Sequence, residues 1–231
     1  MSAYGWVIIG SFLGPFLLSF DKKVAFYKHW RSVFTSIFIV GFPFLLWDEL
    51  FTQWSVWGFT EKYLFGVYLG SLPIEEILFF VIVPYNCIFI FEVLKAYFNN
   101  IIIKKFSKIL YVVIVLISLI NTTFYFNNVY TFYACLIASI LGFIAFYKNS
   151  KWLEYFCLTY LVALIPFLVV NGILTGAITE NPIVWYNENE IIGWRIFTIP
   201  YEDLFYNFDL MFLVTLVHQF LRDKSVSSQS S

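Results

Sequence analysis

Residues 71–80 of the chain read SLPIEEILFF, and a related segment, TIPYEDLFYN, occupies residues 198–207. In both segments a proline is followed, after one residue, by two adjacent acidic side chains and then by an apolar, aromatic-rich run. A helix needs about 20 predominantly apolar residues to cross a bilayer, and both runs are of that order. We therefore expect two membrane helices, each of which carries a carboxyl pair in its first turn.

The composition supports a membrane protein. Of 231 residues, 61% are hydrophobic and 13% are charged, whereas soluble domains are about half apolar and about one quarter charged. Aromatic residues reach 23%, and Tyr and Trp are typical of membrane interfaces. The three cysteines lack metal-ligand and disulfide spacing, and no basic stripe indicates nucleic acid. We expect no metal, no cofactor and no nucleic-acid partner.

Seven apolar runs, separated by polar loops, predict an all-α integral membrane fold with about seven transmembrane helices. The expected spans cover residues 4–20, 32–50, 73–94, 109–126, 129–147, 152–174 and 200–221. The first run lacks the basic flank and cleavage site of a signal peptide. Asn86, inside the third span, is expected to satisfy backbone groups freed by Pro84.

Basic residues fall almost entirely on one side of these spans. Twelve of the 14 Lys and Arg residues lie in the loops on one side, and Lys62 and Arg195 lie on the other. Cytoplasmic loops are enriched in Lys and Arg. The split predicts a multi-pass cell-membrane protein with its N-terminus outside and its C-terminus in the cytoplasm.

The two halves of the chain resemble each other. Residues 42–48 align with residues 165–171, and Pro73 aligns with Pro200. The similarity predicts two parallel three-helix repeats joined by a connector helix, since a shift of four spans preserves orientation. The predicted units are residues 1–105, a connector at 106–128, residues 129–222, and a disordered tail at 223–231. Both acidic pairs then lie at one end of the bundle, on the outer side.

Acidic residues at a membrane boundary have a structural and a functional interpretation. Proline and carboxylates suit the first turn of any helix, and Asp209 inside the last span is compatible with a helix–helix hydrogen bond. Two acidic pairs in register within a repeat favour function. Burial and a nearby like charge both favour the protonated form of a carboxyl group, so that it can donate a proton at neutral pH.

The sequence also lacks the signatures of several other chemistries. It has no dinucleotide-binding fingerprint, no P-loop and no nucleophile elbow. Carboxyl acid–base chemistry in an apolar, aromatic cavity remains. Such a site suits carbocation chemistry on a lipid-soluble alkene, because a carboxylic acid can protonate a double bond and aromatic rings stabilise the cation.

The ordered set of motifs resembles the small integral-membrane lycopene cyclases of the heterodimeric type, here with both Pro-x-Glu-Glu/Asp repeats fused in one chain. The similar segments are Trp47-Asp48, residues 72–80, residues 171–176, residues 185–187, Gly193-x-Arg195 and residues 199–206. They cover nearly all of the chain except the tail.

The resemblance implies a lycopene beta-cyclase, a cofactor-independent enzyme that converts the ψ ends of lycopene to β-ionone rings through γ-carotene to β-carotene. It implies an acid–base set of Glu75, Glu76, Glu202 and Asp203, with the donor and the acceptor left open. Further groups are expected to bind or orient the substrate: Asp48, Asn171, Arg195, Tyr206, Trp57 and Trp185. Lycopene, γ-carotene and membrane lipids are the expected partners, and the fused repeat is compatible with a monomer or a homodimer.

Two alternatives stay open at this stage. One is another membrane prenyl-lipid enzyme, such as an aromatic prenyltransferase, although the chain lacks the Asp-rich metal-diphosphate motif of those enzymes. The other is a non-catalytic carotenoid- or lipid-binding membrane protein, whose behaviour would not depend on the acids. The sequence also leaves open a β or an ε ring, one or two reacting ends, and the acceptance of longer carotenoids.

Overall fold

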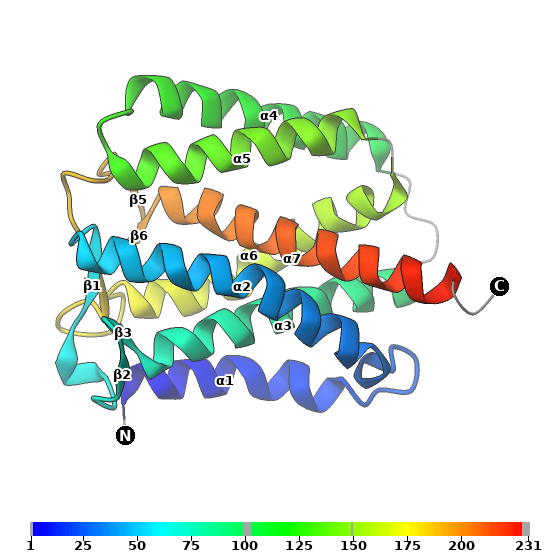
Figure 1. The fold of residues 1–231 in the computed structure, drawn as a ribbon, viewed down its shortest axis with the longest axis horizontal. Coiled ribbons are helices and arrows are strands. Elements are labelled where there is room, and N and C mark those ends of the chain that lie inside the picture. The colour runs from blue at the N-terminus through cyan, green and yellow to red at the C-terminus, as the bar shows by residue number, and fades with distance from the viewer. Residues whose placement is uncertain (1, 99–102, 149, 228–231) are drawn as a thin grey trace.

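The computed structural model describes residues 2–98, 103–148 and 150–227. Its helices run along one long axis (Figure 1): α1 (Ala3–Leu18), α2 (Trp30–Gln53), α3 (Ile74–Tyr97), α4 (Lys104–Phe124), α5 (Val129–Tyr147), α6 (Lys151–Leu174) and α7 (Glu202–Ser227). Among the described residues, six helices are long and apolar enough to cross a membrane, and α1 is a shorter apolar helix. The all-α membrane fold is confirmed.

The ends of the spans differ in detail from the predicted ones. The helix α7 continues to Ser227, past the predicted start of the tail at residue 223. Residues 228–231 lie outside the described residues. Short 3₁₀ turns, η1 (Phe26–His29) and η2 (Glu61–Tyr63), occur in the first two loops.

The two helices that carry the acidic pairs lie at the centre of the bundle. The helices α3 and α7 pack against each other, α2 and α6 each pack against both, α1 covers α3, and α5 covers α7. A helix that is apolar on all sides is normally buried, and both central helices fit this rule. Phe80 and Phe91 on α3, and Phe208 and Phe212 on α7, are at most 1% exposed.

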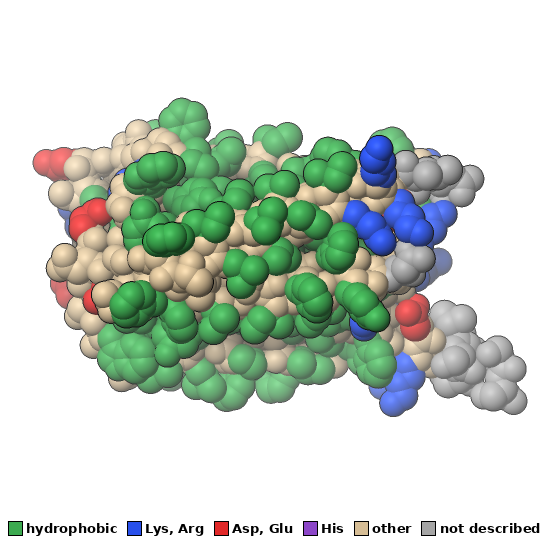
Figure 2. Space-filling model, turned by 90° about the horizontal axis from the view of Figure 1, so that it is seen from above, with side chains coloured by type: hydrophobic (Ala, Val, Ile, Leu, Met, Phe, Trp, Pro, Cys, Tyr) green, Lys and Arg blue, Asp and Glu red, His purple; other side chains and the backbone are tan. Residues whose placement is uncertain are grey.

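The surface is divided along the same long axis. In Figure 2, hydrophobic side chains cover the middle of the molecule, and Lys and Arg side chains gather at the end where the C-terminus lies. An apolar belt bounded by a basic end is the surface expected of a multi-pass membrane protein.

The same small hairpin precedes both central helices. The strands β2 (Tyr68–Leu69) and β3 (Leu72–Pro73) pair before α3, and β5 (Arg195–Ile196) and β6 (Ile199–Pro200) pair before α7. Gly66 and Gly193, two residues before β2 and β5, both have a positive φ, of 78° and 84°, which glycine adopts without steric cost. Pro73 and Pro200 therefore lie in strands just before the helices, not in the first helical turn.

A third pair of strands joins the two long loops. The strand β1 (Trp57–Phe59) runs antiparallel to β4 (Val184–Tyr186), with Trp57 opposite Tyr186. The sequence predicts plain loops here. Strands of two or three residues are too short to show an alternating pattern, so the sequence gives no periodic signal for them.

Candidate active site

A cavity of about 60 Å³ lies where the first turns of α3 and α7 meet the ends of α2 and α6. One acid of each motif lines it, Glu76 from α3 and Asp203 from α7. The other polar and aromatic lining residues are Tyr4, Asp48, Trp57, Phe59, Phe79, Tyr130, Phe167, Asn171, Tyr186, Tyr206 and Asn207. The fold thus brings together two carboxyl groups that are 127 residues apart in the sequence.

The two cavity acids have different hydrogen-bond environments. Glu76 Oε2 accepts one hydrogen bond of 2.5 Å, from the hydroxyl of Tyr4. Asp203 accepts three, from the hydroxyl of Tyr130 at 2.6 Å, the amide of Asn171 at 2.6 Å and the hydroxyl of Tyr186 at 3.0 Å. Hydrogen bonds to a carboxylate favour its charged form, so the surroundings stabilise the anion more strongly at Asp203 than at Glu76.

The first acid of each motif does not line the cavity. Glu75 Oε1 accepts a hydrogen bond of 2.6 Å from the backbone N–H of Phe65, and Glu202 Oε1 accepts one of the same length from that of Ile192. In both cases the donor lies ten residues before the acid. The hydroxyl of Thr131 also donates to Glu202, at 2.6 Å. Both carboxyl groups are buried, at 0% exposure, and each ties its helix to the loop that precedes it.

Four of the predicted orienting side chains, Asp48, Trp57, Asn171 and Tyr206, lie around the cavity acids. Asp48 Oδ1 accepts a 2.6 Å hydrogen bond from the indole N–H of Trp57. Asn171 donates to Asp203, and the ring of Tyr206 lies edge-on to Trp57, with centroids 6.1 Å apart. Asp48 Oδ2 and the hydroxyl of Tyr206 are buried without a hydrogen-bond partner among the described residues.

Arg195 and Trp185 lie away from the acids. The guanidinium of Arg195 pairs with Glu188 at 2.6 Å and donates to the carbonyl oxygen of Thr198 at 2.8 Å. Both residues line a separate outer cavity of about 330 Å³. The indole of Trp185 lies over Gly58 of the opposite strand. The structure therefore brings Glu76, Asp203, Asp48, Asn171, Tyr206 and Trp57 to one cavity and leaves Glu75, Glu202, Arg195 and Trp185 outside it.

The tyrosines that bond the cavity acids were missed as site residues. Tyr4 and Tyr130 lie in the first turns of α1 and α5, and each donates a hydrogen bond to the cavity acid of its own repeat. Tyr186 lies on β4, where no repeat partner indicated it. Burial and the neighbouring Asp203 raise the pKa of Tyr186 well above its usual value, so this hydroxyl stays protonated and remains a donor.

Comparison with known protein families shows which family the chain belongs to. The family model described as lycopene cyclase matches residues 1–94 and 127–221 of the chain. The chain belongs to the lycopene cyclase family. The matched segments carry α1 to α3 and α5 to α7, and α4 falls between them. Searches of curated proteins and of solved structures found no match. The chain is accordingly an enzyme of the cyclase type, with lipid-soluble carotenoid substrates.

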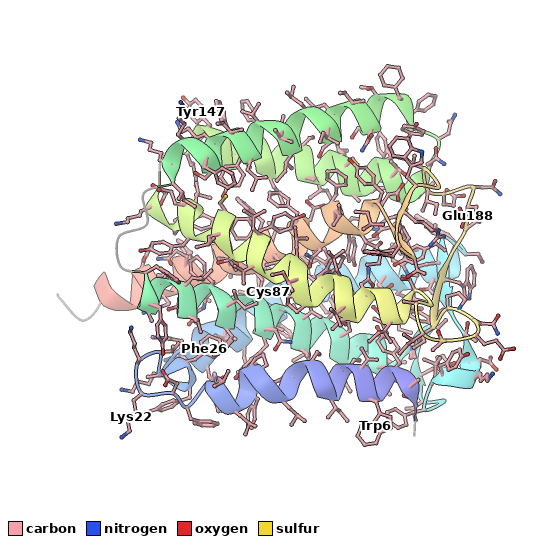
Figure 3. The ribbon with its side chains drawn as sticks, turned by 180° about the vertical axis from the view of Figure 1, so that it is seen from behind. Trp6, Lys22, Phe26, Cys87, Tyr147 and Glu188 are labelled. Carbon is pink, nitrogen blue, oxygen red and sulfur yellow. The ribbon has the colours of Figure 1, made fainter. Side chains whose placement is uncertain are left out.

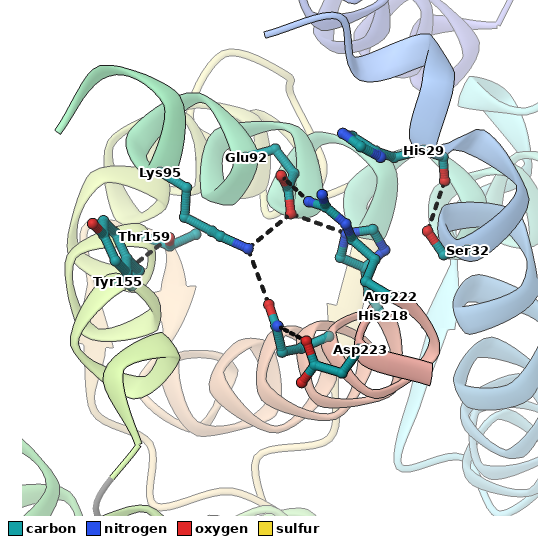
Figure 4. A network of polar contacts seen from close by, with 10 residues as sticks. His29, Ser32, Glu92, Lys95, Tyr155, Thr159, His218, Arg222 and Asp223 are labelled. Atoms are coloured by element: carbon teal, nitrogen blue, oxygen red, sulfur yellow. Dashed lines mark hydrogen bonds and ion pairs between the residues drawn. The ribbon is translucent and has the colours of Figure 1, made fainter. Parts of the chain in front are cut away.

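A second buried polar cluster of this cyclase lies at the opposite end of α3 and α7 (Figure 4). The carboxyl oxygens of Glu92 lie 3.4 Å from the side-chain nitrogen of Lys95, 3.1 Å from Nε2 of His218 and 2.5 Å from a guanidinium nitrogen of Arg222. The contacts of Glu92 with His218 and Arg222 join α3 to α7 far from the cavity acids. We call these four residues the Glu92 cluster. Among the described residues, no group of three or more His, Cys, Asp or Glu side chains is placed to hold a metal ion.

Proposed function

We propose that the protein is a lycopene beta-cyclase that converts ψ end groups to β-ionone rings by acid–base chemistry without a cofactor. The observation that carries the proposal is the cavity in which one acid of each Pro-x-acid-acid motif, Glu76 and Asp203, meets the carboxyl group of Asp48. The β ring is the product that the resemblance implies. On this proposal, residues 1–105 and 129–222 are the two cyclase repeats, and residues 106–128 are the connector.

Glu76 is the proton donor in this proposal. It accepts a hydrogen bond from Tyr4, the one donor that the described residues offer it, and its buried surroundings disfavour the charged form. It transfers a proton to the terminal double bond of the ψ end and becomes a carboxylate. The remaining double bond of the end group then attacks the cation, and a carbon–carbon bond closes the six-membered ring.

Asp203 is the carboxylate that faces the cation. Its three hydrogen-bond donors favour the carboxylate over the protonated form, and a fixed anion stabilises a cation strongly in an apolar site. The rings of Trp57, Tyr130 and Tyr186 line the same cavity and stabilise the cation through their faces. A carboxylate removes a proton from a neighbouring carbon, so one proton enters, one leaves, and the reaction is an isomerisation.

One cavity implies that the two ends of lycopene react in turn. In this proposal both motif acids act on one end group, and among the described residues one such pair, Glu76 and Asp203, lines a cavity. We expect γ-carotene, with one ring, to form first and to bind again with its other end for conversion to β-carotene.

The orientation in the membrane follows from the charge split. In this proposal the basic end of the bundle, which Figure 2 shows, faces the cytoplasm, since cytoplasmic loops are rich in Lys and Arg. The N-terminus and the acid cavity then lie near the outer side of the cell membrane, and the C-terminus lies in the cytoplasm.

The direct test is expression in a bacterium that accumulates lycopene, followed by chromatography of the pigments. The wild-type chain should give γ-carotene and then β-carotene, and the chromatogram separates β- from ε-rings. Glu76→Gln and Asp203→Asn should each abolish ring formation while the protein stays in the membrane. Unchanged lycopene with wild-type protein present in the membrane would contradict the proposal.

A further inference from the structure

A second cavity, of about 400 Å³, lies between α1, α3 and α6. We call it the α1–α6 groove. It shares five lining residues with the acid cavity: Phe79, Val83, Phe167, Asn171 and Asn207. In Figure 3, Cys87, which also lines the groove, lies on α3 between α1 and α6. The groove is therefore continuous with the site that holds the acids.

The groove follows one face of α3 into the apolar middle of the bundle. Phe79, Val83, Cys87 and Ile90 line it, and residues three or four apart lie on the same face of a helix. From Phe79 to Ile90 the helix rises about 16 Å, at 1.5 Å per residue. An elongated apolar space of this kind fits a rod-like hydrocarbon and not a polar or compact ligand.

The main polar group in the groove wall has a structural explanation. Pro15 lacks a backbone N–H, so the carbonyl oxygen of Ser11 has no ordinary helical partner. The amide of Asn86 donates a 3.0 Å hydrogen bond to that oxygen. Asn86 was expected to bond backbone freed by Pro84, whereas its hydrogen bond goes to the carbonyl oxygen that Pro15 leaves without a helical partner. The amide N–H of Asn86 therefore has a partner within the wall of the groove.

The groove opens on the lipid-facing side of the bundle. Near the acids, Tyr4 and Ile8 of α1 belong to the same buried cluster as Leu174 of α6, so the two helices close the site there. Farther from the acids, the groove is lined by Ser11 of α1 and Val169 of α6, and Val169 is 60% exposed. Within the apolar belt, this exposed side chain faces lipid.

We propose that the α1–α6 groove holds the polyene of the substrate while one end group lies against Glu76 and Asp203, and that the substrate enters sideways from the bilayer between α1 and α6. This inference rests on the proposed function for the identity of the substrate. The acid cavity alone, at about 60 Å³, holds about two water molecules, so an end group needs the adjoining groove. The far end of the molecule remains in the groove mouth or in lipid.

The test places tryptophan in the groove and measures lycopene that copurifies with the protein, together with ring formation. Val170→Trp fills the groove, and Val169→Trp narrows its mouth at an exposed position. Ile165→Trp is the matched control, because Ile165 is on the same helix, is 69% exposed and does not line the groove. Lycopene binding is measured in a Glu76→Gln background, which prevents turnover. Membrane level and Tm are measured for each variant.

We expect both groove variants to retain at least about tenfold less lycopene than the Ile165→Trp control, which corresponds to about 1.4 kcal/mol. In the wild-type background they should form rings correspondingly more slowly. Equal lycopene retention and equal ring formation in all three variants would overturn the groove proposal, whatever the wild-type activity. If the wild-type chain forms no rings but lycopene retention still depends on Val169 and Val170, the proposed function fails and the groove stands.

Discussion

The hydroxyl of Tyr4 donates a hydrogen bond of 2.5 Å to Glu76 and joins the first turn of α1 to the first turn of α3. When Glu76 gives up its proton, this hydrogen bond stabilises the carboxylate that forms. A hydrogen bond to a charged group contributes about 1.5–3 kcal/mol, so Tyr4→Phe should lower the rate of ring formation by about 10- to 100-fold. The measurement is the rate of lycopene loss in isolated membranes, normalised to the amount of protein.

The matched control for Tyr4→Phe is Tyr130→Phe, which removes the equivalent hydroxyl in the second repeat. Asp203 keeps the donors Asn171 and Tyr186 in that variant, so we expect a smaller loss. Equal activities of Tyr4→Phe and the wild-type protein would contradict the assignment of Glu76 as the proton donor.

The first acid of each motif should tolerate an amide. Glu202 acts as an acceptor for the N–H of Ile192 and the hydroxyl of Thr131, and a glutamine side-chain oxygen can accept the same bonds. We expect Glu202→Gln to keep more than about one tenth of the wild-type rate, and Glu202→Ala to lose more because it leaves a buried donor unpaired, at about 1–3 kcal/mol. Chromatography of pigments and thermal melting are measured on both variants.

Asp203→Asn is the reference for this comparison, since it alters an acid that lines the cavity. A folded Glu202→Gln protein as inactive as Asp203→Asn would return Glu202 to the acid–base set expected from the sequence. Glu75→Gln offers the same comparison in the first repeat, because Glu75 binds the backbone of Phe65.

The helices and the meeting of the two motifs could be predicted because each depends on long patterns, although α1, with 16 residues, is shorter than the six candidate spans among the described residues. Apolar runs of about 20 residues give the helices, and the repeat places Glu76 and Asp203 at the same end. Which acid of a pair faces the cavity depends on the rotation of the helix. Adjacent residues differ by about 100° around a helix of 3.6 residues per turn, and α3 and α7 are apolar on all sides, so no stripe of polar residues indicates that rotation.

Arg195 shows a different limit of prediction from sequence. The resemblance to the cyclase family predicts that Arg195 binds or orients the substrate. In the structure, hairpin β5–β6 directs it to Glu188 and to the carbonyl of Thr198. A hairpin of two-residue strands leaves no periodic signal, so its effect on a side chain could not be read from the sequence.

Gly58 should be sensitive to the addition of a single methyl group. A Cβ at this position would lie 2.3 Å from Cζ2 of Trp185, closer than real contacts allow. The indole would have to move, and with it the pairing of β1 with β4, which positions Trp57 as a donor to Asp48. We expect Gly58→Ala to lower the rate of ring formation several-fold, measured in membranes as above.

A second change separates this steric effect from a general loss of stability. Trp185→Leu should restore much of the activity of Gly58→Ala, because the smaller side chain leaves room for the methyl group. Gly10→Ala is the neutral control, since a Cβ at Gly10 would have no heavy atom within 4 Å. Failure of Trp185→Leu to restore activity would show that the contact between Gly58 and Trp185 does not limit the site.

Loss of the Glu92 cluster should lower the stability of the protein more than its rate of ring formation. Its carboxyl group is buried between α3 and α7 and contacts Lys95, His218 and Arg222. Removal of one partner of a buried ion pair costs about 3–5 kcal/mol, and an exposed pair contributes about 0–1 kcal/mol. The side chains of Lys95 and Arg222 are about one quarter exposed (26% and 28%). The free-energy cost of Glu92→Gln should therefore fall between these limits, and the variant should lower the Tm of the purified protein. Glu180→Gln, which breaks the exposed pair with Lys62, is the control and should leave the Tm almost unchanged.

Below the denaturation temperature, Glu92→Gln should form rings at a rate near that of the wild-type protein, because Glu92 lies at the far end of α3 from Glu76. A normal Tm combined with lost activity would instead assign the cluster a part in the reaction.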